Sequence, residues 1–177
     1  ATPFAILVKK NTFEPYRSSD SFLSKLELSR EEAIIRSATL LNDTDIIVST
    51  TGKASRELFE YRAKENQGHQ RDFLTVGGMG HANQIALGIA IAKPKKTVYC
   101  FDGDGAALMH TGSLGIIGDL NLKNFKHIVF NNGAHDSVGG QPTIGFDIKF
   151  GDLAKSFNYN KSFRIENSDT FETIFKS

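Results

Sequence analysis

The tripeptide GDG at 103–105 places a carboxylate between two glycines, directly after an apolar run and directly before an amphipathic one. The dipeptide NN at 131–132 follows the next apolar run along the chain. Consecutive parallel strands are often adjacent, so Asp104 and Asn132 are expected to converge at one sheet edge. Magnesium takes oxygen ligands from one or two protein groups together with phosphates and water. The pair therefore favours a cation that bridges the protein to a bound diphosphate.

Simpler interpretations of the same residues stay open at this point. Asp104 alone is equally well explained by a turn or by a helix cap. Asn132, taken alone before Gly133, is better explained by a left-handed turn. The spacing across one predicted helix and one predicted strand is what favours a shared site. The glycine-rich loops at 49–53 and 76–80 belong to the same predicted edge, where glycine lets a backbone approach a phosphate.

Composition excludes several classes of function. The 177 residues are enough for one domain, 40% are hydrophobic, and the net charge of +1 provides no basic stripe for nucleic acid. No apolar run reaches the roughly 20 residues of a membrane span, and no signal peptide is recognisable. The single Cys100 lies in an apolar run, which indicates a buried thiol in a reducing compartment. We therefore expect a cytoplasmic protein that binds neither nucleic acid nor membrane.

Alternating apolar and amphipathic runs predict an α/β fold, a three-layer αβα sandwich with a mostly parallel sheet. A capping box at Ser29 opens the first helix, and Asp169 with Glu172 opens the last. We expect residues 1–28 to be a linker or arm from a preceding domain and residues 29–177 to be the domain itself. Strands are expected at 4–9, 46–49, 73–76, 97–101, 127–130 and 162–165, and helices at 29–41, 54–64, 81–92, 106–120, 152–157 and from 169.

The stretch from Gly103 to Asn132 resembles the signature of thiamine-diphosphate-dependent enzymes, GDG followed by NN. The resemblance implies the thiamine-diphosphate-binding fold of the domain that holds the diphosphate. It also implies that Asp104, Asn132 and the backbone carbonyl of Ala134 ligate magnesium. The segment VGGMGHANQIALGIA at 76–90 is similar to a second motif of the same superfamily.

That second motif implies further contacts to thiamine diphosphate. Gly77 would offer its carbonyl to the exocyclic amine, and Met79 would prop the cofactor in a bent conformation, although a methionine is also an ordinary core residue. The segment STTGK at 49–53 resembles the loop that closes over the diphosphate. The cofactor-binding residues implied in this way are Thr51, Gly52, Gly77, Gly78, Met79, Gly103, Asp104, Gly105, Ala106 and Asn132.

At family level the chain resembles the phosphonopyruvate decarboxylases, with sulfopyruvate decarboxylases as close relatives. The likeness lies in AILVKKNTFEPY, LSREEAI, GGMGHANQIALGIA and NNGAHDSVGGQPT and covers most of the chain. It implies decarboxylation of a small 2-oxo acid that carries a second anionic group, in phosphonate biosynthesis. His135 is the candidate catalytic residue, with a plain loop histidine as the alternative. Lys53, Ser137 and Gln141 are the candidate substrate contacts.

Enzymes of this type also use a pyrimidine-binding domain, which the sequence does not contain. We expect a C-terminal fragment, inactive without that domain or subunit, that works in a homo-oligomer. The alternatives are the beta subunit of a sulfopyruvate decarboxylase, an acetolactate-synthase-type carboligase, and a non-enzymatic nucleotide-binding module. The absence of GxGxxG after a predicted strand counts against nicotinamide binding.

Overall fold

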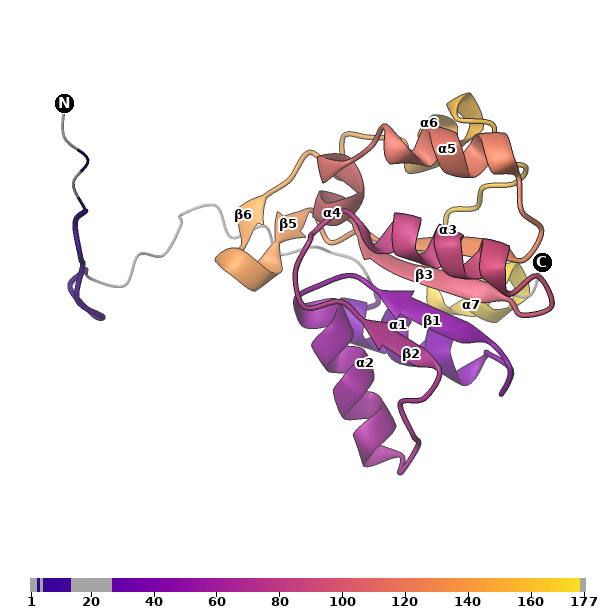
Figure 1. Ribbon diagram of the computed structural model, residues 1–177, viewed down its shortest axis with the longest axis horizontal. Coiled ribbons are helices and arrows are strands. Elements are labelled where there is room, and N and C mark those ends of the chain that lie inside the picture. Colours follow the sequence, from indigo (N-terminus) through magenta and orange to yellow (C-terminus); the bar gives the residue numbers. More distant parts are fainter. Residues whose placement is uncertain (1–2, 4, 14–26, 176–177) are drawn as a thin grey trace.

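The computed structural model describes residues 3, 5–13 and 27–175, and its centre is a four-stranded parallel sheet in the order β2-β1-β3-β4 (Figure 1). The strands of this sheet are β1 (Ile46–Ser49), β2 (Asp72–Leu74), β3 (Val98–Gly103) and β4 (Phe125–Phe130). A two-stranded antiparallel ribbon, β5 (Ala134–His135) with β6 (Gln141–Pro142), follows β4. The predicted α/β class with a parallel sheet is confirmed.

Helices cover both faces of the sheet (Figure 1). The helices are α1 (Arg30–Thr39), α2 (Lys53–Lys64), α3 (Ala82–Ala92), α4 (Asp104–Met109), α5 (Ser113–Leu120), α6 (Phe150–Ser156) and α7 (Ser168–Phe175), with a 3-10 turn η1 at Asp136–Val138. Helices α1 and α2 pack on one face, and α3 and α5 pack on the other. This arrangement is the predicted three-layer sandwich.

The two hydrophobic cores follow from the alternation of side chains along each strand. On β1, Ile47 joins the core under α1 and α2, whereas its neighbour Val48 joins the core under α3 and α5. On β3, Phe101 and Cys100 divide in the same way, and both are fully buried. Strands buried on both faces read as continuous apolar runs, which is why these two were recognisable in the sequence.

Capping explains where the first and last helices begin. The Ser29 side chain accepts from the Glu32 backbone N–H, and the Glu32 carboxylate accepts from the Ser29 backbone N–H at 2.8 Å, so the predicted capping box is confirmed. Helix α7 begins at Ser168, slightly before the expected Asp169. Asn167 is the side chain that accepts from its first turn, through the Thr170 N–H at 3.2 Å.

The predicted single helix over 106–120 is wrong, because it is two helices. The chain leaves helical geometry at His110, with φ −129° and ψ 46°. The Thr111 hydroxyl donates back to the carbonyl of Leu108 at 2.9 Å, and this competes with continuation of the helix. The loop before α3 also packs closely against this break, since a Cβ on Gly80 would lie 2.5 Å from the His110 ring.

Two predicted strands do not form. Residues 5–9 have no strand partner within the described part of the chain, and Leu7 is 96% exposed; Phe4 lies outside the described residues. The segment at 162–165 is likewise irregular, since no described strand pairs with it, and the Ser162 hydroxyl donates to the Gly151 carbonyl of α6 instead. Most of the predicted arm at 1–28 lies outside the described residues. Among the described helices, none is both long and apolar enough to cross a membrane.

Candidate functional site

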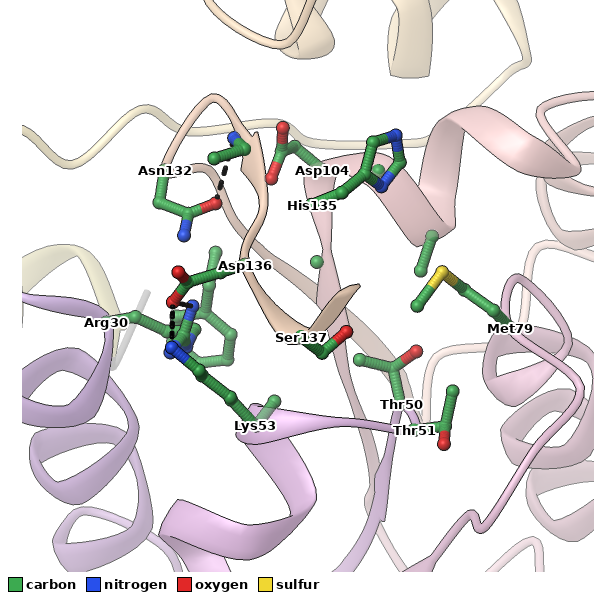
Figure 2. A pocket seen from close by; sticks show the side chains of 16 residues that line it. Arg30, Thr50, Thr51, Lys53, Met79, Asp104, Asn132, His135, Asp136 and Ser137 are labelled. Carbon is green, nitrogen blue, oxygen red and sulfur yellow. Dashed lines mark hydrogen bonds and ion pairs between the residues drawn. The ribbon is translucent and has the colours of Figure 1, made fainter. Parts of the chain in front are cut away.

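All four parallel strands end at the same edge of the sheet, and the loops that follow them surround one pocket (Figure 2). The pocket collects most of the residues that the sequence singled out. Those that line it are Thr51, Lys53, Met79, Gly103, Asp104, Gly105, Ala106, Asn132, Ala134, His135 and Ser137. Gly52, Gly77, Gly78 and Gln141 are not among its lining residues. Gly52 instead lines a neighbouring groove, whereas Gln141 is an exposed residue of β6, opposite His135.

Asp104 lies at the junction of β3 and α4, and only 1% of its surface is exposed. One of its carboxylate oxygens accepts a hydrogen bond from the Thr143 hydroxyl. Asn132, the second residue after β4, uses its side-chain oxygen to accept from the Ala134 N–H at 3.3 Å. Both side chains are therefore held by protein hydrogen bonds, Asn132 within its own loop and Asp104 by a residue of the loop after β4. Thr143 was not recognised from the sequence, because a contact across 39 residues leaves no local pattern.

Two glycines let the loop after β4 come close to the rest of the site. A Cβ on Gly105 would lie 2.5 Å from the His135 ring, and a Cβ on Gly52 would lie 2.9 Å from the Ser137 side chain. Gly52 also has φ +101°, which L side chains rarely adopt. Any larger residue at these two positions would push the loop away from the pocket.

The pocket contains one buried polar group that the described protein atoms leave unsatisfied. The Thr50 hydroxyl is buried and has no hydrogen-bond partner among the described residues. Asp104, Asn132 and Ala134 all line this cavity, and they carry a carboxylate, an amide oxygen and a backbone carbonyl. Oxygen donors of these kinds are what magnesium prefers, and an orphaned hydroxyl is suited to a phosphate oxygen. The residues present therefore fit a magnesium diphosphate.

A chain of ion pairs closes the side of the pocket opposite Met79 (Figure 2). Arg30 binds Glu57 through two hydrogen bonds, 2.6 and 2.9 Å long, and reaches Asp136 at 3.0 Å. Lys53 reaches the same Asp136 oxygen at 2.9 Å. Hydrogen bonds from Lys53 and then from Arg30 lower the pKa of the Asp136 carboxyl, and the hydrogen bond to Glu57 is the main cause that raises the pKa of Arg30.

Arg30 and Asp136 were not identified from the sequence. Arg30 was recognised only as part of the capping-box segment, and its partner Asp136 is 106 residues away. The one local signal was the position of Asp136 beside His135 in a polar loop.

Comparison with known proteins gives the following matches. A family model described as "Thiamine pyrophosphate enzyme, C-terminal TPP binding domain" matches residues 50–177. A phosphonopyruvate decarboxylase of Streptomyces viridochromogenes is 42% identical over 113 residues, which are 64% of this chain and 27% of that protein. The sulfopyruvate decarboxylase subunit beta of Methanocaldococcus jannaschii is 35% identical over 138 residues, which are 77% of this chain and 70% of that subunit.

Solved structures agree on the fold. A thiamine diphosphate-dependent 4-hydroxybenzoylformate decarboxylase of Rhodococcus jostii RHA1 superposes with a TM-score of 0.69 at 19% identity, covering 99% of this chain and 33% of that one. At this identity the likeness concerns the fold alone. The matched region spans only 27% and 31% of two phosphonopyruvate decarboxylases, so those relatives contain much that this chain does not.

Proposed function

This chain belongs to the thiamine pyrophosphate enzymes, as their C-terminal TPP-binding domain, and on that premise we propose that it is the cofactor-binding part of a 2-oxo acid decarboxylase. Its cofactors are thiamine diphosphate and Mg²⁺. One observation supports the proposal most: Asp104, Asn132 and Ala134 line the same pocket as Met79, at the carboxyl edge of the sheet.

The proposed roles rest on the pocket for the residues that line it, and on the family resemblance alone for Gly52, Gly77 and Gly78. The Asp104 carboxylate, the Asn132 side-chain oxygen and the Ala134 carbonyl would hold Mg²⁺. Contacts to the organic cofactor are proposed for Thr51, Gly52, Gly77, Gly78, Met79, Gly103, Gly105 and Ala106. When bound, the thiazolium supplies the electron sink that decarboxylation of a 2-oxo acid requires. The residues of this chain would bind the cofactor, orient it and enclose the reacting groups.

For the substrate we propose phosphonopyruvate, converted to phosphonoacetaldehyde and carbon dioxide in phosphonate biosynthesis. The two phosphonopyruvate decarboxylases at 42% and 38% identity support this choice. Lys53 and Ser137 line the pocket, and with Gln141 they are proposed to contact the substrate's anionic groups. His135, whose ring packs against Gly105, is the proposed catalytic residue.

A second candidate is the beta subunit of a sulfopyruvate decarboxylase. It is favoured by coverage, because the match spans 70% of the Methanocaldococcus jannaschii subunit rather than a small part of a longer chain. In both cases we propose a pyrimidine-binding domain or subunit as the partner, within a cytoplasmic homo-oligomer. An acetolactate-synthase-type carboligase is less well supported, since an Escherichia coli acetolactate synthase matches only 44% of the chain. A non-enzymatic nucleotide-binding module is less well supported, since the family model that matches is that of a TPP-binding domain.

The substrate is tested by measuring carbon dioxide release and aldehyde formation by the full-length protein with its pyrimidine-binding partner. Phosphonopyruvate and sulfopyruvate are compared with thiamine diphosphate present, with Mg²⁺ and with EDTA. We expect faster turnover of phosphonopyruvate, and only with Mg²⁺. Preference for sulfopyruvate would establish the second candidate. Release of carbon dioxide from neither acid would overturn the proposed function.

A further inference from the structure

A chain of polar side chains crosses the core beneath the pocket. One Asp102 oxygen accepts from the Gly103 N–H at 3.0 Å, and the other lies 3.2 Å from His127 Nε2. On the far side of the ring, His127 Nδ1 lies 3.3 Å from the Tyr159 hydroxyl. The Asp102 side chain is fully buried, and that of His127 is only 6% exposed. We call these three side chains the Asp102 network.

The strand register explains how the network assembles. Cys100 on β3 is the direct neighbour of His127 on β4, and Asp102 lies two residues further along β3 on the same face. The surroundings are apolar, and the core residues that pack there include Val98, Leu114, Ile117 and Phe125. A buried carboxylate is costly unless it is hydrogen-bonded, so an apolar residue at 102 would be the cheaper way to fill this core.

A metal ion is not what this group is arranged to bind. Cys100, Asp102 and His127 are the one set of His, Cys and acidic residues within the described ranges whose potential ligand atoms lie within 4.8 Å of one another. Yet Asp102 and His127 already bind each other, and the outer ring nitrogen of His127 already faces Tyr159. Burial, and then the Asp102 charge, raise the pKa of the Cys100 thiol well above its ordinary value, which disfavours the thiolate that a metal needs.

The end of the network lies at the magnesium site. Gly103, whose N–H the Asp102 carboxylate holds, is the N-terminal cap of α4, with φ −102° and ψ 157°. The next residue is Asp104, so the backbone changes from extended to helical at this peptide. The direction in which the Asp104 side chain points therefore depends on the orientation of the Gly103 peptide.

We propose that Asp102 is a positioning residue for the magnesium and diphosphate site, an inference that rests on the proposed function. Its carboxylate fixes the Gly103 peptide and so aims Asp104 into the pocket. On the side away from the pocket, His127 fixes the orientation of that carboxylate through its Nε2, and Tyr159 in turn fixes His127 through its Nδ1. Groups that hydrogen-bond to metal ligands directly contribute about 10- to 100-fold to metal affinity. Asp102 acts through the adjacent Gly103 peptide, so we expect an effect at the lower end, about 10-fold.

The test compares three variants of the full-length protein with its pyrimidine-binding partner. Asp102→Ala removes the acceptor, Asp102→Asn keeps an oxygen for the Gly103 N–H, and Cys100→Ala is the matched control. Cys100 is equally buried on the same strand, but it has no part in the network's hydrogen bonds. Affinity for thiamine diphosphate is measured by calorimetry over a series of Mg²⁺ concentrations, and thermal unfolding is recorded for each variant.

We expect Asp102→Ala to weaken the Mg²⁺-dependent affinity about 10-fold and Asp102→Asn to restore most of it. Cys100→Ala should leave the affinity within about twofold, even where it lowers the melting temperature as much, because it removes packing alone. Wild-type affinity in Asp102→Ala would overturn the proposal. So would an equal loss in Cys100→Ala, since that would make the effect a general loss of core packing.

Two additions keep the test decisive. If Asp102→Ala does not fold, Tyr159→Phe removes only the far hydroxyl and should weaken affinity about 2- to 5-fold; no change there would overturn the proposal. Amide exchange at Gly103, measured without cofactor, should be faster in Tyr159→Phe and Asp102→Ala than in Cys100→Ala. This readout separates the two claims: a wild-type protein that fails to bind thiamine diphosphate contradicts the proposed function, whereas unchanged exchange at Gly103 contradicts the network.

Discussion

At the scale of single residues, Asp136 connects three parts of the chain that are distant in sequence. It receives Arg30 from the start of α1 and Lys53 from the start of α2, while it belongs to the loop after β4. Its neighbours His135 and Ser137 both line the pocket. The ion pairs therefore fix the position of this loop over the site, and they involve a guanidinium that is only 15% exposed.

A double-mutant cycle with Arg30→Gln and Asp136→Asn should give a coupling free energy of about 0.5–1 kcal/mol in urea unfolding. The control is the cycle at the surface pair of Lys155 and Asp152, 3.7 Å apart and about two thirds exposed, which should give nearly zero. Equal coupling free energies in the two cycles would contradict the claim that these ion pairs hold the loop after β4 in place.

The contribution of Asp136 to stability depends on pH. Because the pKa of its carboxyl is lowered in the folded protein, the contribution is present at neutral pH and is lost as the pH falls below the ordinary pKa of 3.8.

At the scale of elements, the sequence predicted best what local patterns determine. The β1 run is continuously apolar because it is buried on both faces, and α1 has its capping box within four residues of sequence. The secondary-structure predictions were wrong where contacts with residues distant in the sequence influence the conformation of a segment. Residues 5–9 have the apolar pattern of a strand without a partner strand in the described structure. At the α4–α5 break, Gly80 of the loop before α3 lies close to His110, in addition to the local Thr111 hydrogen bond.

Helix packing at this scale is tested by two glycines that look alike in sequence. A Cβ on Gly118, in α5, would overlap the carbonyl oxygen of Phe157, so Gly118→Ala should lower the free energy of unfolding by about 1–3 kcal/mol. A Cβ on Gly88, in α3, meets nothing within 4 Å, so Gly88→Ala should raise it by about 0.5–1 kcal/mol. Urea unfolding of both variants measures the difference. A stabilising Gly118→Ala would mean that α5 does not pack closely against the end of α6.

At the scale of the whole molecule, the parallel sheet is what assembles the site. Because the four strands of the parallel sheet end at one edge, loops more than 80 residues apart in sequence, from Thr51 to His135, line one pocket. This is why Asp104 and Asn132 could be placed together from the sequence once parallel strands were expected. Arg30 and Thr143 could not, since only the folded chain brings them to the pocket, and the local pattern did not single out Thr50 or Asp136 within their loops. The roles proposed for all these residues stay predictions.

The reactivity of the Cys100 thiol measures whether the domain is folded. Its side chain is fully buried in the core between β3 and α3, and burial raises its pKa well above the ordinary value. The native thiol should therefore react with a thiol reagent only when the domain unfolds, at a rate that rises with urea concentration in step with unfolding. Thiol titration with and without urea measures this. Reaction at the rate of a free thiol in native buffer would contradict the core described here.

The most direct test of the central claim is whether binding of thiamine diphosphate depends on Mg²⁺ through Asp104. Calorimetric titration is carried out on the full-length protein with its pyrimidine-binding partner, in Mg²⁺ and in EDTA, for the wild type and for Asp104→Ala. We predict binding by the wild type only in Mg²⁺ and none by Asp104→Ala, because the carboxylate would hold the cation that bridges the diphosphate. Equal affinity in EDTA, or unchanged affinity in Asp104→Ala, would contradict the account.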